Sequence, residues 1–125
     1  MHHALELDVI TDHRKLAAFT LADELAVRAY TATRMFPADE RFGIRSQIRR
    51  AAVSVPTNIV EGCARDSERE KARFFEIALG SAREAIYLID LSGRLKLLDS
   101  HAADELALFG GRVAAALAAL RKTLA

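Results

Sequence analysis

The residues of this chain that are best suited to chemistry are arginines, and they are concentrated in its middle third. Residues 41–75 carry eight basic and four acidic side chains, whereas the whole chain has a net charge of only +1. A guanidinium group can hold a phosphate through two parallel hydrogen bonds, so arginines at helical spacing are candidates for nucleic-acid contact. Six form the predicted nucleic-acid-binding set: Arg41, Arg45, Arg49, Arg65, Arg69 and Arg73.

A solvated or salt-bridged surface explains the same basic residues without a ligand. Asp66, Glu68 and Glu70 alternate with the later arginines and with Lys71, which we also count as surface charge. Charge runs are usually solvated faces, and no aromatic residues alternate with the basic ones in the manner that stacks bases. We therefore expect RNA or DNA to bind weakly, without sequence preference and with a strong salt dependence. Contact between subunits is a third use of these charges.

Residues 50–61 contain polar and apolar side chains to which we assign structural roles. Asn58 and Glu61 interrupt an otherwise packed segment, and we assign them with Arg50 to a structural polar network, in which they form hydrogen bonds or ion pairs with Arg50 or with a neighbouring helix. Val53 and Val60 fall on a flank away from the main apolar stripe, where an isolated domain would leave them in water. We predict that they form part of a subunit interface.

Patterns typical of catalysis or of metal binding are missing from the sequence. No Glu has a His three residues later, which is the spacing of bundle di-iron sites, and His13 and His101 have no ligands at suitable spacing. Cys63 has no identifiable His partner, so we expect an inert thiol. We predict no catalytic residue, no metal and no cofactor. The alternative is an RNA-processing enzyme whose site assembles between subunits, suggested only by the concentration of Arg, Asn and Glu.

Hydrophobic periodicity predicts the scaffold that positions these residues. Four apolar-periodic segments at about 11–35, 40–60, 67–91 and 99–124 read as helices, and no segment reads as a strand. Three short connectors between long helices make neighbours antiparallel, so we predict an all-α, up-down-up-down four-helix bundle. The 125 residues form one domain, 1–125, with a loosely ordered N-terminal segment at 1–10.

Several residues within the predicted helices have specific expectations. Pro56 should kink its helix without ending it, because the apolar stripe continues beyond it, and Gly62 should end that helix in a left-handed conformation. Ser67 and Glu70 have the spacing of a capping box. Gly80 should mark a close approach of another helix. The stripe of the second helix consists of Ile44, Ile48, Ala51, Ala52, Val55 and Ile59.

Composition limits where the protein works. A single Cys rules out an internal disulfide framework and fits a reducing compartment. The longest apolar run near the C-terminus, residues 113–120, is far too short to span a membrane, and the N-terminus lacks the pattern of a signal peptide. We expect a soluble, cytoplasmic protein with no membrane partner.

Four motifs at fixed spacing then carry a family resemblance. They read FPxxERFG, SQIRRAAxSVPxNIxEG, RxSxxE and FxIAxGS. Together they resemble the four-helix-bundle family named after proteins encoded in intervening sequences of 23S ribosomal RNA genes. The resemblance covers about residues 15–95 closely, and it implies a four-helix bundle, a ring-shaped homopentamer and no known enzymatic activity.

A related branch of that family comprises accessory proteins of diversity-generating retroelements, which bind nucleic acid and a reverse transcriptase. That branch is much more basic than this chain, and Phe19 stands here where the family often has a Trp. The sequence thus predicts a non-catalytic, homo-oligomeric bundle that acts as a weak nucleic-acid-binding or protein-binding module.

Overall fold

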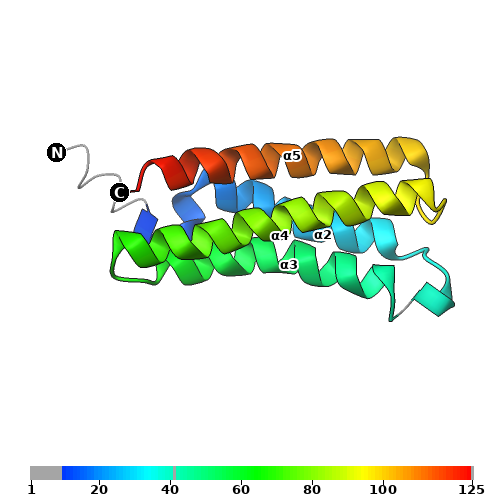
Figure 1. The fold of residues 1–125 in the computed structure, drawn as a ribbon, viewed down its shortest axis with the longest axis horizontal. Coiled ribbons are helices and arrows are strands. Elements are labelled where there is room, and N and C mark those ends of the chain that lie inside the picture. The colour runs from blue at the N-terminus through cyan, green and yellow to red at the C-terminus, as the bar shows by residue number, and fades with distance from the viewer. Residues whose placement is uncertain (1–9, 41, 125) are drawn as a thin grey trace.

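Four antiparallel helices make up the structure, a computed structural model that describes residues 10–40 and 42–124. Each helix packs against two neighbours, because α2 and α4 both contact α3 and α5 (Figure 1). No strand occurs in the described ranges, and the predicted all-α four-helix bundle is confirmed. Two short 3-10 helices, η1 (His13–Lys15) and η2 (Ala38–Glu40), accompany α2 (Ala17–Thr33), α3 (Ile44–Cys63), α4 (Glu68–Arg94) and α5 (Ser100–Lys122).

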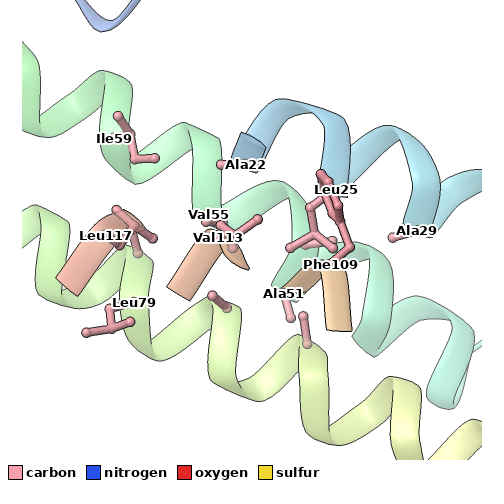
Figure 2. Packing of buried hydrophobic residues seen from close by; sticks show 14 of the residues in the cluster. Ala22, Leu25, Ala29, Ala51, Val55, Ile59, Leu79, Phe109, Val113 and Leu117 are labelled. Atoms are coloured by element: carbon pink, nitrogen blue, oxygen red, sulfur yellow. The ribbon is translucent and has the colours of Figure 1, made fainter. Parts of the chain in front are cut away.

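The core lies along the axis of the bundle and draws on all four helices. Leu25 of α2, Val55 of α3 and Val113 of α5 are fully buried near its middle (Figure 2). Alanines on the inward faces, among them Ala22 and Ala82, allow the helices to approach closely. Complete burial of each large apolar side chain contributes about 1.5–3 kcal/mol. The apolar stripes therefore supply most of the stability of the bundle.

The second long helix, α3, follows its sequence pattern closely. The six residues of its predicted stripe are all buried, and the helix continues through Pro56 without interruption. Since Pro56 lies between the buried residues Val55 and Ile59, tertiary packing holds the helix together where one backbone hydrogen bond is missing. The prediction of a continuous helix is confirmed.

The start of the first helix differs from the prediction. Asp12 caps only the 3-10 helix η1, by accepting a hydrogen bond from the Arg14 backbone N–H at 3.1 Å. Leu16 then adopts an extended backbone (φ −93°, ψ 126°) and is buried, and α2 begins at Ala17. The extended residue lets Leu16 join the core together with Ile10, which is also buried. Residues 1–9, the rest of the expected loose N-terminal segment, lie outside the described residues.

Gly62 and Gly80 play roles other than those predicted. No glycine in the described residues has positive φ, and α3 continues through Gly62 to Cys63. A Cβ atom on Gly62 would lie 2.7 Å from the Phe75 ring, so a side chain is excluded there by close packing of α3 against α4. A Cβ atom on Gly80 would meet nothing within 4 Å. The close approach predicted at Gly80 is therefore absent, and tight contacts occur instead at Gly62, Gly93 and Gly110.

The predicted start of α4 is confirmed. Ser67 adopts the extended backbone of an N-cap, and its hydroxyl accepts a hydrogen bond from the Glu70 backbone N–H at 3.1 Å. Within the helix, Phe75 is fully buried, whereas Phe74 is partly exposed. Because α4 and α3 are antiparallel, the first turns of α4 lie beside the last turns of α3.

Candidate functional site

Three arginines converge where α3 begins. Together with one aromatic and one hydroxyl side chain they line a shallow depression of about 370 Å³. We call this group the arginine cluster, and it consists of Tyr30, Arg45, Ser46, Arg49 and Arg50. All but Tyr30 lie in the first two turns of α3, and Tyr30 comes from the last turn of α2. The cluster contains three positive charges and no carboxylate.

Arg49 is fixed in position by α2. Its Nε donates a hydrogen bond to Thr33 Oγ1 at 2.9 Å, and its Nη2 donates one to the Tyr30 carbonyl oxygen at 3.3 Å. Its guanidinium carbon lies 4.3 Å from the centroid of the Tyr30 ring, which is cation–π distance. The Thr33 hydroxyl in turn donates to the Ala29 carbonyl at 2.8 Å. Arg49 therefore joins α3 to the C-terminal turn of α2 and has N–H groups left for other partners.

Arg45, Ser46 and Arg50 are different, since their side chains form no hydrogen bond or ion pair with any residue that the structure describes. Arg45 and Ser46 are partly buried and Arg50 is exposed. They stand at the start of a 20-residue helix, where free backbone N–H groups and the helix dipole favour negative charge. The chemistry available at this position is the binding of an anion with several oxygen atoms.

The predicted set of arginines does not form one continuous strip. Arg65, Arg69 and Arg73 lie near the C-terminal end of α3 and the start of α4, at the opposite end of the bundle from Arg45 and Arg49 (Figure 1). The 20 residues of α3 separate the two groups by about 30 Å at 1.5 Å per residue. Arg41 lies outside the described residues.

The arginines at that second end have acidic or aromatic neighbours. Arg65 Nη2 lies 2.7 Å from Glu61 Oε2, and the Arg65 guanidinium carbon lies 4.8 Å from the centroid of the Phe74 ring. Arg69 and Arg73 line a separate depression together with two glutamates, Glu70 and Glu76. One of these, Glu76, also pairs with Arg121 of α5 at 2.7 Å. Arg65 is therefore paired, whereas Arg69 and Arg73 form no ion pair with a described residue but share their depression with two carboxylates.

Asn58 belongs to a polar contact between α3 and α4. Its Nδ2 donates to the carbonyl oxygen and to the hydroxyl of Ser54, at 2.8 Å and 2.9 Å. The Ser54 hydroxyl lies 2.9 Å from the Ser81 hydroxyl of α4. Asn58 thus orients Ser54, and the serine pair joins the two helices through their partly buried flank.

The alternative in which Glu61 pairs with Arg50 is wrong. Glu61 pairs with Arg65, which follows in the connector after α3, and Arg50 belongs to the arginine cluster. Arg50 and Glu61 are eleven residues apart, which places them three turns from each other along the helix axis. Glu61 therefore contributes to the end of α3 and not to a network with Arg50.

Val53 and Val60 lie on the outer flank of α3, as their positions in the sequence indicated. Their exposed fractions are 39% and 37%, although their helix neighbours Val55 and Ile59 are fully buried. They stand two turns apart on one side of the helix. The two valines offer an apolar strip on the surface of the isolated bundle.

Lys71 was expected on the surface, but the structure buries it. Its exposed fraction is 2%, and its Nζ donates hydrogen bonds to the carbonyl oxygens of Cys63 and Arg65. The Cys63 carbonyl belongs to the last residue of α3, where backbone acceptors have no partners within the helix, and the Arg65 carbonyl lies in the connector that follows. We call this contact the Lys71 cap. Helical spacing could have indicated this burial, because Lys71 lies on the same face of α4 as the buried Phe75 and Ala78.

The buried thiol of Cys63 is chemically quiet. Burial raises its pKa to about 11, against a smaller lowering by the positive charge of Lys71. At neutral pH the thiol is therefore protonated, which suits neither a nucleophile nor a metal ligand. In the part of the chain that the structure describes, no three His, Cys, Asp or Glu residues are grouped as metal ligands would be. No helix there is long and apolar enough to cross a membrane.

Comparison with known proteins adds one finding. The sequence matches the model of the family described as "23S rRNA-intervening sequence protein" over residues 14–118. This range begins in η1 and extends through most of α5, so it takes in all four long helices. No curated protein matches the sequence.

Proposed function

Because the chain belongs to the family of 23S rRNA-intervening sequence proteins, we propose that it is a non-catalytic bundle protein that assembles with copies of itself and binds nucleic acid weakly through its arginine cluster. The observation that carries this proposal is that three arginines line one depression and that two of them have no partner among the described residues. Unpaired arginines gathered in one depression are suited to phosphate oxygens.

The proposed binding is weak because the protein as a whole is nearly neutral. A net charge of +1 provides little long-range attraction for a polyanion. Affinity then depends on a few local phosphate contacts and on the counterions that these contacts release. We expect binding of single-stranded RNA or DNA without sequence preference, because contacts to phosphate oxygens carry no direct information about the base sequence.

Self-assembly is supported by the apolar strip of Val53 and Val60. Exposed valines on an otherwise polar flank are removed from water when a second copy covers them, which favours association. The family resemblance makes a ring-shaped homopentamer the specific expectation. Native mass spectrometry should show an assembly of this size at micromolar concentration, and a monomer would contradict the assembly proposal.

The non-catalytic part of the proposal is supported by the lining of the depression. Arginines, a serine and a tyrosine surround it, and neither a carboxylate nor an imidazole is present there to transfer protons. We also propose that the protein works in the cytoplasm, which agrees with a buried, reduced Cys63.

Fluorescence anisotropy with a labelled single-stranded RNA tests binding and catalysis together. Anisotropy should rise with protein at low salt and fall back as salt is added, while gel analysis shows intact RNA. Absence of binding at low salt would remove the nucleic-acid part of the proposal. Cleavage of the RNA by the purified protein would favour instead an RNA-processing enzyme with a site between subunits.

A further inference from the structure

We propose that the arginine cluster recognises a terminal phosphate, the phosphomonoester at the end of a nucleic-acid strand, in preference to the internal phosphodiesters of its backbone. This inference rests on the proposed binding of nucleic acid and specifies which group of the strand the cluster holds. It follows from three properties of the cluster: its charge, its isolation and the geometry of its donors.

The charge of the cluster suits a terminal phosphate better than an internal one. Arg45, Arg49 and Arg50 bring three positive charges to one small depression, and no carboxylate lines it. A phosphomonoester carries about −1.5 to −2 charges at neutral pH and has three free oxygen atoms. An internal phosphodiester carries a single negative charge and has two free oxygens. The monoester therefore matches more of the available charge and more of the donors.

The cluster also lies apart from the other candidate arginines, so it cannot follow the phosphate backbone of a strand along its length. A strand bound along its length needs positive groups at successive phosphates, since charges in a duplex strand follow each other at about 3.4 Å. The other candidate arginines, Arg69 and Arg73, lie at the far end of α3 beside Glu70 and Glu76. With about 370 Å³ of space, the depression has room for one phosphate and part of its nucleotide.

The donors that line the depression differ in how firmly they are held. Arg49 is held by Thr33 and by the Tyr30 carbonyl, so its guanidinium is already oriented before a ligand binds. Arg45 and Arg50 have no such restraint in the described structure, so their side chains can adjust to a phosphate. Ser46 adds a hydroxyl donor in the first turn of α3, where the helix dipole also favours an anion. A preoriented donor combined with adaptable ones suits a compact dianion.

The test compares oligonucleotides of one short sequence that differ only in their ends. The set has a 5′ phosphate, a 3′ phosphate or hydroxyl groups at both ends, each made as RNA and as DNA. Binding is measured by anisotropy competition with the intact oligomeric protein. We expect strands with a terminal phosphate to bind about tenfold more tightly, because they gain hydrogen bonds between charged groups. Comparison of the RNA set with the DNA set shows whether the cluster prefers the phosphorylated end of RNA or of DNA.

Two double variants with the same loss of charge assign the preference to its position. Arg45→Ala with Arg50→Ala should abolish the preference for a phosphorylated end and leave thermal stability unchanged, because neither side chain has a partner in the described structure. Arg69→Ala with Arg73→Ala should retain the preference. Arg45→Lys keeps the charge and removes the two-pronged guanidinium, so it should weaken the preference without abolishing it.

Three outcomes would overturn the inference. Equal binding of phosphorylated and hydroxyl-ended strands would overturn it while leaving the proposed function standing. Failure of every strand to bind at low salt would overturn both. If a phosphoserine peptide competed as well as the phosphorylated strand, the cluster would be a site for phosphoproteins, and its assignment to nucleic-acid ends would be wrong.

Discussion

The two ends of α3 carry similar numbers of basic residues but use them in opposite ways. At the C-terminal end, Lys71 is buried against the carbonyls of Cys63 and Arg65, and Arg65 pairs with Glu61. At the N-terminal end, Arg45 and Arg50 have no partner among the described residues. At the C-terminal end, part of the positive charge stabilises the fold and the rest shares a depression with two glutamates, whereas Arg45 and Arg50 line a depression that has no carboxylate. The density of basic residues alone does not distinguish the two uses.

The largest expected effect lies at the C-terminal end, in the Lys71 cap. Lys71→Ala leaves a cavity and removes the donor from two buried carbonyls, so it should lower the free energy of unfolding by about 2–5 kcal/mol. Chemical denaturation measures this loss. Lys71→Met, which keeps most of the volume, separates the hydrogen bonds from the packing. An unchanged stability in both variants would mean that the Lys71 cap does not hold α3 to α4.

The pH dependence of stability should also report on the burial of Cys63 at the C-terminal end of α3. The Cys63 thiol has a pKa of about 11 in the folded protein, above its ordinary value of 9.0, because burial disfavours the thiolate. The folded state therefore holds the thiol proton more tightly than the unfolded state does. This contribution is intact below about pH 9 and is lost as pH rises towards 11, by about 2–3 kcal/mol. Cys63→Ala should lack that part of the alkaline decline, and identical pH profiles would contradict the burial of the thiol.

Gly62 tests the close packing beside the Lys71 cap. Gly62→Ala places a methyl group 2.7 Å from the Phe75 ring, so it should destabilise the protein by about 1–3 kcal/mol. Gly80→Ala is the matched control, because its Cβ atom meets nothing within 4 Å. That change should stabilise α4 by about 0.5–1 kcal/mol. Thermal unfolding compares the two, and a stabilising Gly62→Ala would show that α3 and α4 are less tightly packed there.

The smallest effects on stability are expected within the arginine cluster. Arg49→Ala removes hydrogen bonds to Thr33 and to the Tyr30 carbonyl and should cost about 1 kcal/mol. Arg45→Ala and Arg50→Ala should each change stability by less than about 0.5 kcal/mol. Denaturation curves of the three variants measure this difference within one cluster. A large loss for Arg45→Ala or Arg50→Ala would place that side chain in the fold and not in a ligand site.

Local signals predicted much of the fold. The stripe of α3, its continuity through Pro56 and the cap at Ser67 follow from spacing and backbone chemistry within one segment, and all three are confirmed. Leu16 and Gly62 differ from prediction because tertiary packing decides them. The burial of Leu16 interrupts the first helix, and the ring of Phe75 occupies the space beside Gly62.

The candidate site was less predictable, because its partners are distant in the sequence. The contacts of Arg49 with Tyr30 and Thr33 join residues 19 and 16 positions apart. From the sequence alone Lys71 is predicted to be a surface charge, because its burial depends on the end of α3 that packs beside it. Spacing identified Arg45 and Arg49 as neighbours. The length of α3 places Arg65, Arg69 and Arg73 at the other end of the bundle, and the predicted helix bounds already implied this separation.

The most direct test of the contrast between the two ends is the salt dependence of single-stranded RNA binding in two charge-matched double variants. The slope of log affinity against log salt changes by about 0.7 for each phosphate that the protein no longer neutralises. Arg45→Ala with Arg50→Ala should reduce its magnitude by about 0.7, because the depression holds one phosphate, and Arg69→Ala with Arg73→Ala should leave it nearly unchanged. Equal reductions in both variants would show that the two ends attract nucleic acid alike, and they would contradict the account.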